Sequence, residues 1–146
     1  MRVHDTEEMM AEAARFLATL SLRADGATVV ALKGELGAGK TAFVKGIAKV
    51  LGVAEQVTSP TFVIMKIYDL EGQKFKRLVH IDAYRLKGAH HLHILGWEDL
   101  IRDPENLICM EWPEMVNVAV PNNAIKITLR YTGEDEREIT YEESWA

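Results

Sequence analysis

The sequence predicts an α/β fold with a mixed, mostly parallel central sheet that is flanked by helices and extended by antiparallel additions. Three observations support this prediction. Apolar runs of strand length alternate along the chain with segments of helical spacing, as expected when helices cover a sheet. A short polar connection at residues 69–73 joins two consecutive strand-like runs, so one strand pair is antiparallel and the sheet is mixed. Alternating residues on both sides of a turn at 132–136 predict a C-terminal hairpin.

Each expected element follows from its local pattern. The first is an amphipathic helix over residues 5–20, with Asp5 or Thr6 as its cap and two glutamates in its first turn. The next helix is expected over residues 41–51, where Gly52 ends it, and one or two short helices are expected over residues 88–101. A loop is expected between Pro113 and Pro121. The strands are expected at residues 28–32, 62–68, 77–82, 107–112, 125–131 and 137–142.

Composition narrows the class of protein. A length of 146 residues predicts one domain, and an apolar fraction of 48% with 27% charged residues is typical of a soluble globular protein. The net charge of −5 argues against a strong direct grip on nucleic acid, which would show a basic excess. The one cysteine, Cys109, suits a reducing compartment, and we expect a buried, inert thiol. We expect no membrane span and no targeting peptide, which makes the cytoplasm the default location.

The motif that carries the clearest chemistry is a glycine-rich loop between the strand at 28–32 and the helix at 41–51. It matches G-x-x-x-x-G-K-[ST] at every fixed position, and it predicts a P-loop NTPase-like domain over residues 1–146. Its glycines allow backbone N–H groups to wrap a phosphate, Lys40 would reach the β- and γ-phosphates, and the Thr41 hydroxyl would ligate Mg²⁺. The expected phosphate-binding residues of the motif are Glu35, Leu36, Gly37, Ala38, Gly39, Lys40 and Thr41.

Acidic side chains end two of the predicted strands. Asp82 ends the strand at 77–82, and Glu111 follows the apolar run at 107–110. A magnesium–triphosphate site needs acids at strand ends beside the phosphate loop, because the crevice of an open α/β sheet lies there. We expect Glu111 to help to hold Mg²⁺ beside Thr41, and Asp82 to orient the attacking water or accept its proton. The exchanged assignment stays open at this point.

Other side chains have both a functional and a structural interpretation. Arg85 would neutralise charge in the transition state, or form a surface ion pair. Thr61 would sense the γ-phosphate, or satisfy local backbone in a turn. Trp112 would stack on a base or a partner, or be half-buried in the core. His90, His91 and His93 form a cluster for which a solvated helix face is a simpler explanation than a metal site.

Five blocks of sequence together point to a known family. The blocks are the loop at residues 34–41, Ser59-Pro60-Thr61-Phe62, His80-Ile81-Asp82-Ala83-Tyr84-Arg85-Leu86, Leu95-Gly96 and Glu111-Trp112-Pro113-Glu114. Together they resemble the TsaE (YjeE) family, the bacterial ATPases of tRNA threonylcarbamoyladenosine modification. They occur in the family's order and cover about residues 5–142, and the combination is more specific than the loop alone.

The resemblance implies a small ATPase that works with the TsaB–TsaD pair, in which TsaD transfers the threonylcarbamoyl group to adenosine 37 of tRNAs reading codons that begin with A. It implies that residues 37–42, including Ala42, contact the phosphates, that Thr41 and Glu111 hold Mg²⁺, and that Asp82 is the candidate catalytic acid. It places Thr6 and the loop at 133–136 near the base of ATP. The pair His90-His91 departs from the family, which usually carries acidic residues there.

Three alternatives to a partner-dependent ATPase remain at this stage. A small-molecule kinase would use Asp82 as the base toward an acceptor hydroxyl, but it usually carries an Arg-rich lid, and the middle of this chain after Asp82 offers only Arg85 and Arg102. A GTPase would need a guanine-reading N-K-x-D segment, which the sequence lacks. A nucleotide-sensing adaptor would bind ATP and hydrolyse it negligibly by itself.

Overall fold

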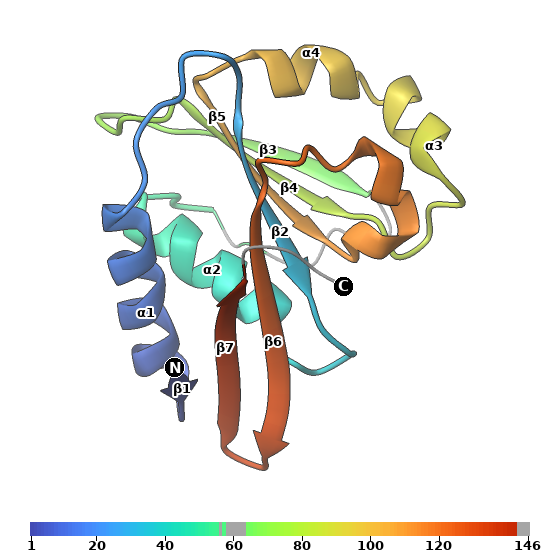
Figure 1. Cartoon of the computed structure of the whole chain (residues 1–146). Coiled ribbons are helices and arrows are strands. Elements are labelled where there is room, and N and C mark those ends of the chain that lie inside the picture. Colours follow the sequence, from blue (N-terminus) through green and yellow to red (C-terminus); the bar gives the residue numbers. More distant parts are fainter. Residues whose placement is uncertain (56, 58–63, 143–146) are drawn as a thin grey trace.

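The computed structural model describes residues 1–55, 57 and 64–142, and these residues form one sheet of seven strands. The strand order is β1-β7-β6-β2-β5-β4-β3 (Figure 1). Neighbours β6–β2, β2–β5 and β5–β4 are parallel, whereas β1–β7, β7–β6 and β4–β3 are antiparallel. The strands are β1 (Arg2–Val3), β2 (Thr28–Lys33), β3 (Met65–Asp69), β4 (Arg77–Asp82), β5 (Asn106–Glu111), β6 (Ile125–Gly133) and β7 (Glu136–Glu142).

Helices cover both faces of the sheet. On one face lie α1 (Thr6–Ala18) and α2 (Lys40–Val50), and on the other lie α3 (Ala89–Ile94), α4 (Trp97–Arg102) and the 3₁₀ helix η1 (Pro113–Ala119) (Figure 1). The buried strand β5 shows why both faces need cover. Its residues 107 and 109 join the apolar cluster under α1 and α2, whereas residues 108 and 110 join the cluster under α3, α4 and η1. Alternate side chains point to opposite faces, so a fully apolar strand must be central.

The two helices on the first face pack closely against each other. Gly46 of α2 permits this approach, because a Cβ at this position would lie 3.1 Å from the Cβ of Ala13 in α1. The rings of Phe16 and Phe43 meet with their centroids 5.7 Å apart. Helix α1 is capped by Asp5, whose carboxylate accepts a hydrogen bond from the backbone N–H of Glu8 at 2.8 Å. The two packing contacts join the middle and the last turn of α1 to the middle and the first turn of α2.

The predicted α/β class and mixed sheet are confirmed, and the differences are local. Two elements were missed: strand β1, which is only Arg2–Val3 and pairs with β7, and helix η1, which lies where a loop was expected. A two-residue strand has no periodicity to detect, and it forms because β7 offers it an edge. The first part of the expected strand at 62–68 lies outside the described residues, and β3 begins at Met65. No helix of the described residues is long and apolar enough to cross a membrane.

Candidate nucleotide-binding site

The glycine-rich loop connects the end of β2 to the start of α2. Gly39 is the N-cap of α2 and has a φ of 102°, and Gly37 has a φ of 81°. These are left-handed backbone conformations that non-glycine residues rarely adopt. Gly34 is needed for a different reason, because a Cβ there would lie 2.5 Å from the backbone oxygen of Leu129 in β6. The glycines therefore allow both the tight curvature of the loop and its close packing against the sheet.

The side chain of Lys40 folds back into this loop. Its Nζ donates a hydrogen bond to the backbone oxygen of Gly34 and lies 3.5 Å from the ring centroid of Trp112. The residue is only 5% exposed, and burial lowers the pKa of Lys40, opposed by the negative charges of nearby carboxylates. The ammonium group of Lys40 therefore lies against the indole ring of Trp112, beside the phosphate loop.

Parallel pairing brings the two predicted acids together. Asp82 at the end of β4 lies opposite Glu111 at the end of β5 in the β4–β5 register, and both side chains are buried, at 4% and 3% exposed. The hydroxyl of Thr41 lies 3.1 and 3.0 Å from the two carboxylate oxygens of Glu111. The carboxylate of Asp82 accepts a hydrogen bond from the backbone N–H of Tyr84 at 3.0 Å. The candidate metal ligands Thr41 and Glu111 therefore adjoin, with Asp82 beside them.

Trp112 directly follows Glu111 and has a left-handed backbone with a φ of 58°. This conformation is uncommon for a bulky residue, and it is supported by a hydrogen bond from the Trp112 N–H to the oxygen of Leu32 at 3.3 Å. The indole packs against the ring of Tyr84, with centroids 4.8 Å apart. Trp112 is half-buried and also lines the site, and its stacking on a base or a partner stays a prediction.

These side chains line one cavity of about 410 Å³. Its wall consists of residues 36–42 of the loop and α2 on one side and the strand-end residues on the other, with Arg137 of β7 closing an edge. The lining residues from the strand ends are Asp82, Tyr84, Glu111 and Trp112. A larger cavity of about 800 Å³ lies beside it, over β6, and shares Ala38 and Trp112. We call the smaller one the phosphate cavity, as the candidate site for phosphates, because of the two it is the one lined by Lys40, Thr41 and both acids.

A further cavity, of about 240 Å³, adjoins the phosphate loop at Gly39. Thr6 and neighbours at the start of α1 line it together with Glu134 and Asp135 of the β6–β7 turn. It shares Gly39, Ala42 and Arg137 with the phosphate cavity. The positions expected near the base of ATP, Thr6 and the turn, thus lie together next to the phosphate loop.

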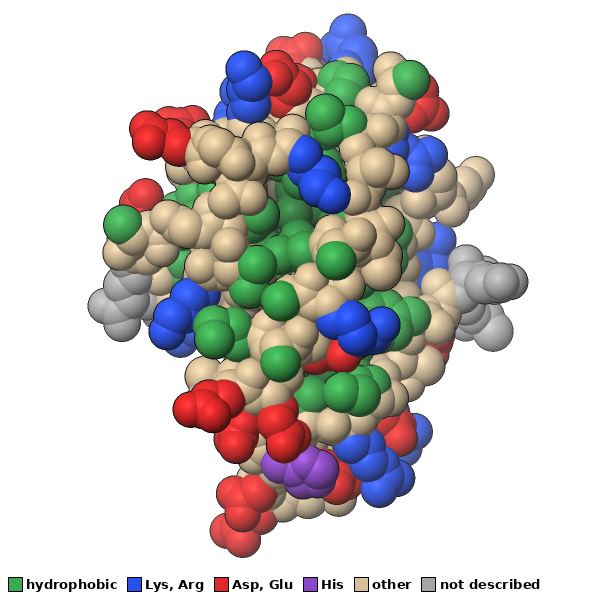
Figure 2. All heavy atoms as spheres, turned by 90° about the vertical axis from the view of Figure 1, so that its left-hand side faces the viewer, with side chains coloured by type: hydrophobic (Ala, Val, Ile, Leu, Met, Phe, Trp, Pro, Cys, Tyr) green, Lys and Arg blue, Asp and Glu red, His purple; other side chains and the backbone are tan. Residues whose placement is uncertain are grey.

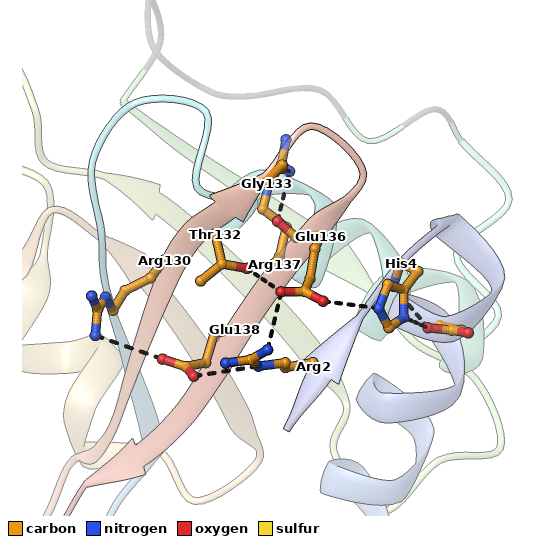
Figure 3. Close-up of polar contacts among 9 residues, drawn as sticks. Arg2, His4, Arg130, Thr132, Gly133, Glu136, Arg137 and Glu138 are labelled. Carbon is orange, nitrogen blue, oxygen red and sulfur yellow. Dashed lines mark hydrogen bonds and ion pairs between the residues drawn. The ribbon is translucent and has the colours of Figure 1, made fainter.

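Arg137 joins the two cavities. Its Nε donates to the backbone oxygen of Gly37 at 3.0 Å, and its Nη1 donates to the backbone oxygens of Gly133 and Glu136 at 3.3 and 3.0 Å. Figure 3 shows the surrounding network, in which Glu136 receives hydrogen bonds from Thr132 and His4. The β6–β7 turn is therefore tied both to the phosphate loop and to the N-terminal segment.

The face that carries α1 is acidic at this end. Figure 2 shows acidic side chains gathered around a histidine at its lower end, where Figure 1 places the N-terminus and the β6–β7 turn. His4 contacts Glu8 at 2.9 Å and Glu136 at 3.0 Å, and these two hydrogen bonds raise the pKa of His4.

Some predicted residues are not brought into the phosphate cavity. Arg85 is exposed and is not among the described residues that line the cavity, and Glu35 lines the neighbouring larger cavity instead. Thr61 lies outside the described residues. The roles of Arg85 and Thr61 therefore stay predictions.

The three histidines at positions 90, 91 and 93 make contacts with different side chains. The ring of His93 pairs with Glu98 at 2.6 Å, whereas His90 and His91 contact each other edge to face. Within residues 1–55, 57 and 64–142, no group of three or more His, Cys, Asp or Glu side chains is arranged to hold a metal. The thiol of Cys109 is buried, and burial raises its pKa to about 12, as expected for an inert side chain.

Two residues of the site had been given no role in the sequence. Arg137 carries no local signal, because only the pairing of β6 with β7 brings it back to a loop 100 residues earlier. His80 had a detectable signal: it precedes Asp82 by two positions in one strand, so both side chains share a face of the sheet.

The known proteins to which this chain is similar share one name. The family model described as "Threonylcarbamoyl adenosine biosynthesis protein TsaE" matches residues 3–139. Three proteins named tRNA threonylcarbamoyladenosine biosynthesis protein TsaE illustrate the similarity. That of Bacillus subtilis is 36% identical over 113 residues, which cover 77% of this chain and 68% of that protein. That of Streptomyces coelicolor is 44% identical over 108 residues, covering 72% and 68%, and that of Rickettsia bellii is 32% identical over 136 residues, covering 92% and 88%.

A solved structure agrees with this similarity. The crystal structure of Bacillus subtilis YdiB matches with a TM-score of 0.75 and 32% sequence identity, covering 97% of this chain and 82% of that chain. The fold predicted from the sequence is therefore found both in the chain itself and in a sequence relative.

Proposed function

The chain belongs to the TsaE family, and from this premise we propose that it is a Mg²⁺-dependent P-loop ATPase that supports threonylcarbamoyladenosine modification of tRNA. We propose further that it acts with the TsaB–TsaD pair, on tRNAs that read codons beginning with A and carry the modification at adenosine 37. The cytoplasm is the proposed location. The observation that carries the ATPase part is the convergence of Lys40, Thr41, Asp82 and Glu111 on one cavity of about 410 Å³.

The chemistry of the donor set suits magnesium. Mg²⁺ takes hard oxygen ligands, commonly one or two protein groups together with phosphates and waters. The hydroxyl of Thr41 and the carboxylate of Glu111 are such ligands and already adjoin. When bound, the ion would neutralise charge that develops on the phosphates of ATP. Asp82 would orient the attacking water, because it lines the same cavity as Lys40 and Thr41.

Binding of the phosphates requires a change at Lys40. In the structure its ammonium group is satisfied by the oxygen of Gly34 and the ring of Trp112. A phosphate oxygen is a stronger partner than a neutral carbonyl, since the hydrogen bond then joins two charges. We propose that Lys40 swings from Gly34 to the β- and γ-phosphates, while the loop N–H groups and the start of α2 hold the anion. The base of ATP would occupy the cavity beside Thr6.

The experiment that tests the function is reconstitution. Threonylcarbamoylation of tRNA by TsaB and TsaD is measured over many turnovers, with ATP and Mg²⁺, in the presence and absence of this chain. We expect slow ATP hydrolysis by the chain alone, faster hydrolysis with the pair, and sustained modification only when all three are present. Equal modification without the chain contradicts the proposed role. Rapid phosphorylation of a small-molecule acceptor would instead favour the kinase alternative.

A further inference from the structure

A histidine lies in the core directly behind the candidate metal ligands. His80 of β4 has no exposed surface, and its Nε2 lies 2.6 Å from Oε2 of Glu111. An ionised carboxylate only accepts hydrogen bonds, so the Nε2–H donates to Glu111. The other ring nitrogen, Nδ1, is buried and has no hydrogen-bond partner in the part of the chain that the structure describes. Glu111 is thus the polar contact that anchors this ring.

Packing by itself does not explain a histidine at this position. The neighbouring side chains on the same face of β4 and β5, Leu78 and Cys109, are buried and belong to the apolar cluster under α1 and α2. A buried polar group costs free energy when it lacks partners, and here one ring nitrogen lacks one. An apolar residue would fill such a core position without this cost. The bond to Glu111 is therefore the property that distinguishes His80 from an aliphatic side chain.

The geometry restrains the carboxylate of Glu111 from two sides. His80 of β4 bonds one of its oxygens, and Thr41 of α2 contacts both. The three residues come from three different elements, and the register of β4 and β5 sets the position of His80 relative to Glu111. Among the described residues, both His80 and Thr41 contact Oε2 of Glu111, whereas Thr41 contacts Oε1.

We propose that His80 is a positioning residue that holds the Glu111 carboxylate in the orientation in which it ligates Mg²⁺. The inference rests on the proposed function, which assigns the ion to Thr41 and Glu111. Groups that orient a metal ligand typically change metal affinity by about 10- to 100-fold when they are removed. His80 would therefore contribute to the magnesium-dependent part of nucleotide affinity while touching neither the ion nor the nucleotide.

The test compares two substitutions of His80. His80→Gln can present an amide donor near the place of Nε2, whereas His80→Leu fills the core and removes the donor. Equilibrium binding of the non-hydrolysable ATP analogue with a β,γ-imido bridge is measured for each variant in EDTA and in saturating Mg²⁺. In EDTA, we expect His80→Leu to bind the analogue with an affinity within about twofold of that of the unmodified chain. The factor by which Mg²⁺ increases the affinity should be about tenfold smaller in His80→Leu, whereas His80→Gln should keep most of it.

A double variant establishes the route of the effect. If His80 acts through Glu111, adding His80→Leu to Glu111→Gln changes the Mg²⁺ gain no further than Glu111→Gln alone. Thermal unfolding in EDTA shows whether each variant is folded, and His80→Asn, whose shorter amide falls short of Glu111, replaces His80→Leu if the latter unfolds at the binding temperature.

Two outcomes overturn the inference, and they are distinguishable. The role of His80 is contradicted if folded His80→Leu or His80→Asn keeps the full increase in affinity that Mg²⁺ gives, which includes an equal loss of affinity in EDTA and in Mg²⁺. This outcome leaves the proposed function standing. An unmodified chain whose affinity gains nothing from Mg²⁺ contradicts the magnesium assignment itself, and the inference falls with it.

Discussion

The two sides of the candidate nucleotide site are built in different ways. On the strand-end side, which consists of residues 34–41 with Asp82 and Glu111, the residues Lys40, Asp82 and Glu111 are buried, and Thr41 and Glu111 are paired at fixed positions of helix and sheet. The hairpin side, which consists of the start of α1 and the β6–β7 turn, is held by exposed ion pairs such as His4 with Glu136 and Arg2 with Glu138. The charged groups assigned to binding and chemistry are therefore buried on one side, whereas the contacts of the other side lie at the surface.

This difference indicates which substitutions should have large effects on ATP binding and hydrolysis. A buried charge interacts strongly and is costly to leave unpaired, whereas exposed ion pairs contribute on the order of 0–1 kcal/mol and are screened by salt. We therefore expect the strand-end side to control binding and chemistry, and the hairpin side to adjust affinity. Four changes, from the largest expected effect to the smallest, test this division.

The largest effect is expected for Lys40→Ala. It removes the only loop side chain with a positive charge, so binding of ATP with Mg²⁺ should fall by at least about 100-fold, measured by calorimetry or a fluorescent ATP analogue. Lys45→Ala is the matched control, because Lys45 lies on the exposed side of the same helix. Unchanged affinity in Lys40→Ala would contradict the assignment of the phosphate cavity.

Next, Asp82→Ala should separate binding from chemistry. Because Asp82 is assigned to the attacking water and not to the phosphates, ATP affinity should stay within a few-fold while the rate of hydrolysis falls by about 100- to 10,000-fold. Single-turnover hydrolysis with TsaB and TsaD is the measurement, and Asp99→Ala, on the exposed surface of α4, is the control. Turnover within a few-fold of the unmodified chain would make Asp82 a structural residue.

On the hairpin side, Arg137→Ala should have a moderate effect. It removes the bonds that join the loop at Gly37 to the β6–β7 turn, so we expect ATP affinity to fall by about three- to tenfold. Arg130→Ala is the matched control, since Arg130 lies on the partner strand and pairs with Glu138 in the exposed network. A loss as large as that of Lys40→Ala would break the division between the two sides.

The smallest effect is expected from the charge of His4. The hydrogen bonds to Glu8 and Glu136 raise its pKa above 6.5 in the folded chain, so the stabilisation they give is fully present below about pH 6.5 and is lost as the pH rises through the raised value. An NMR titration should show the raised pKa, and Glu136→Gln should lower it while Glu134→Gln, in the same turn, should not. A His4 pKa that Glu136→Gln leaves unchanged would remove the proposed link across the hairpin side.

The strand-end side was largely predictable because its signals are local. The loop motif, the helix after it and the acids at the ends of apolar strands are each contained in a few consecutive residues, and the general rule for open α/β sheets places strand ends at one edge. The structure added what spacing does not encode: that Trp112 covers Lys40, and that Glu111 is bound by both Thr41 and His80.

The hairpin side was much less predictable. Its contacts join residues about 130 positions apart, such as His4 and Glu136, and the two-residue strand β1 that supports them is too short to show a pattern. The resemblance placed Thr6 and residues 133–136 near the base, but it gave no role to Arg137, whose position depends on the register of β6 with β7.

Short stretches of sequence were enough to predict the class of fold, the phosphate loop and the two acids, because periodicity, glycine positions and strand ends can be recognised within a few consecutive residues. Tertiary structure alone decided which groups meet: the register of β4 with β5 sets Asp82 beside Glu111, and the closure of the β6–β7 turn carries Arg137 to Gly37. The physical reason is that side-chain pairing between strands depends on the hydrogen-bond register of the whole sheet, and a shift of one residue would turn each of these side chains to the opposite face.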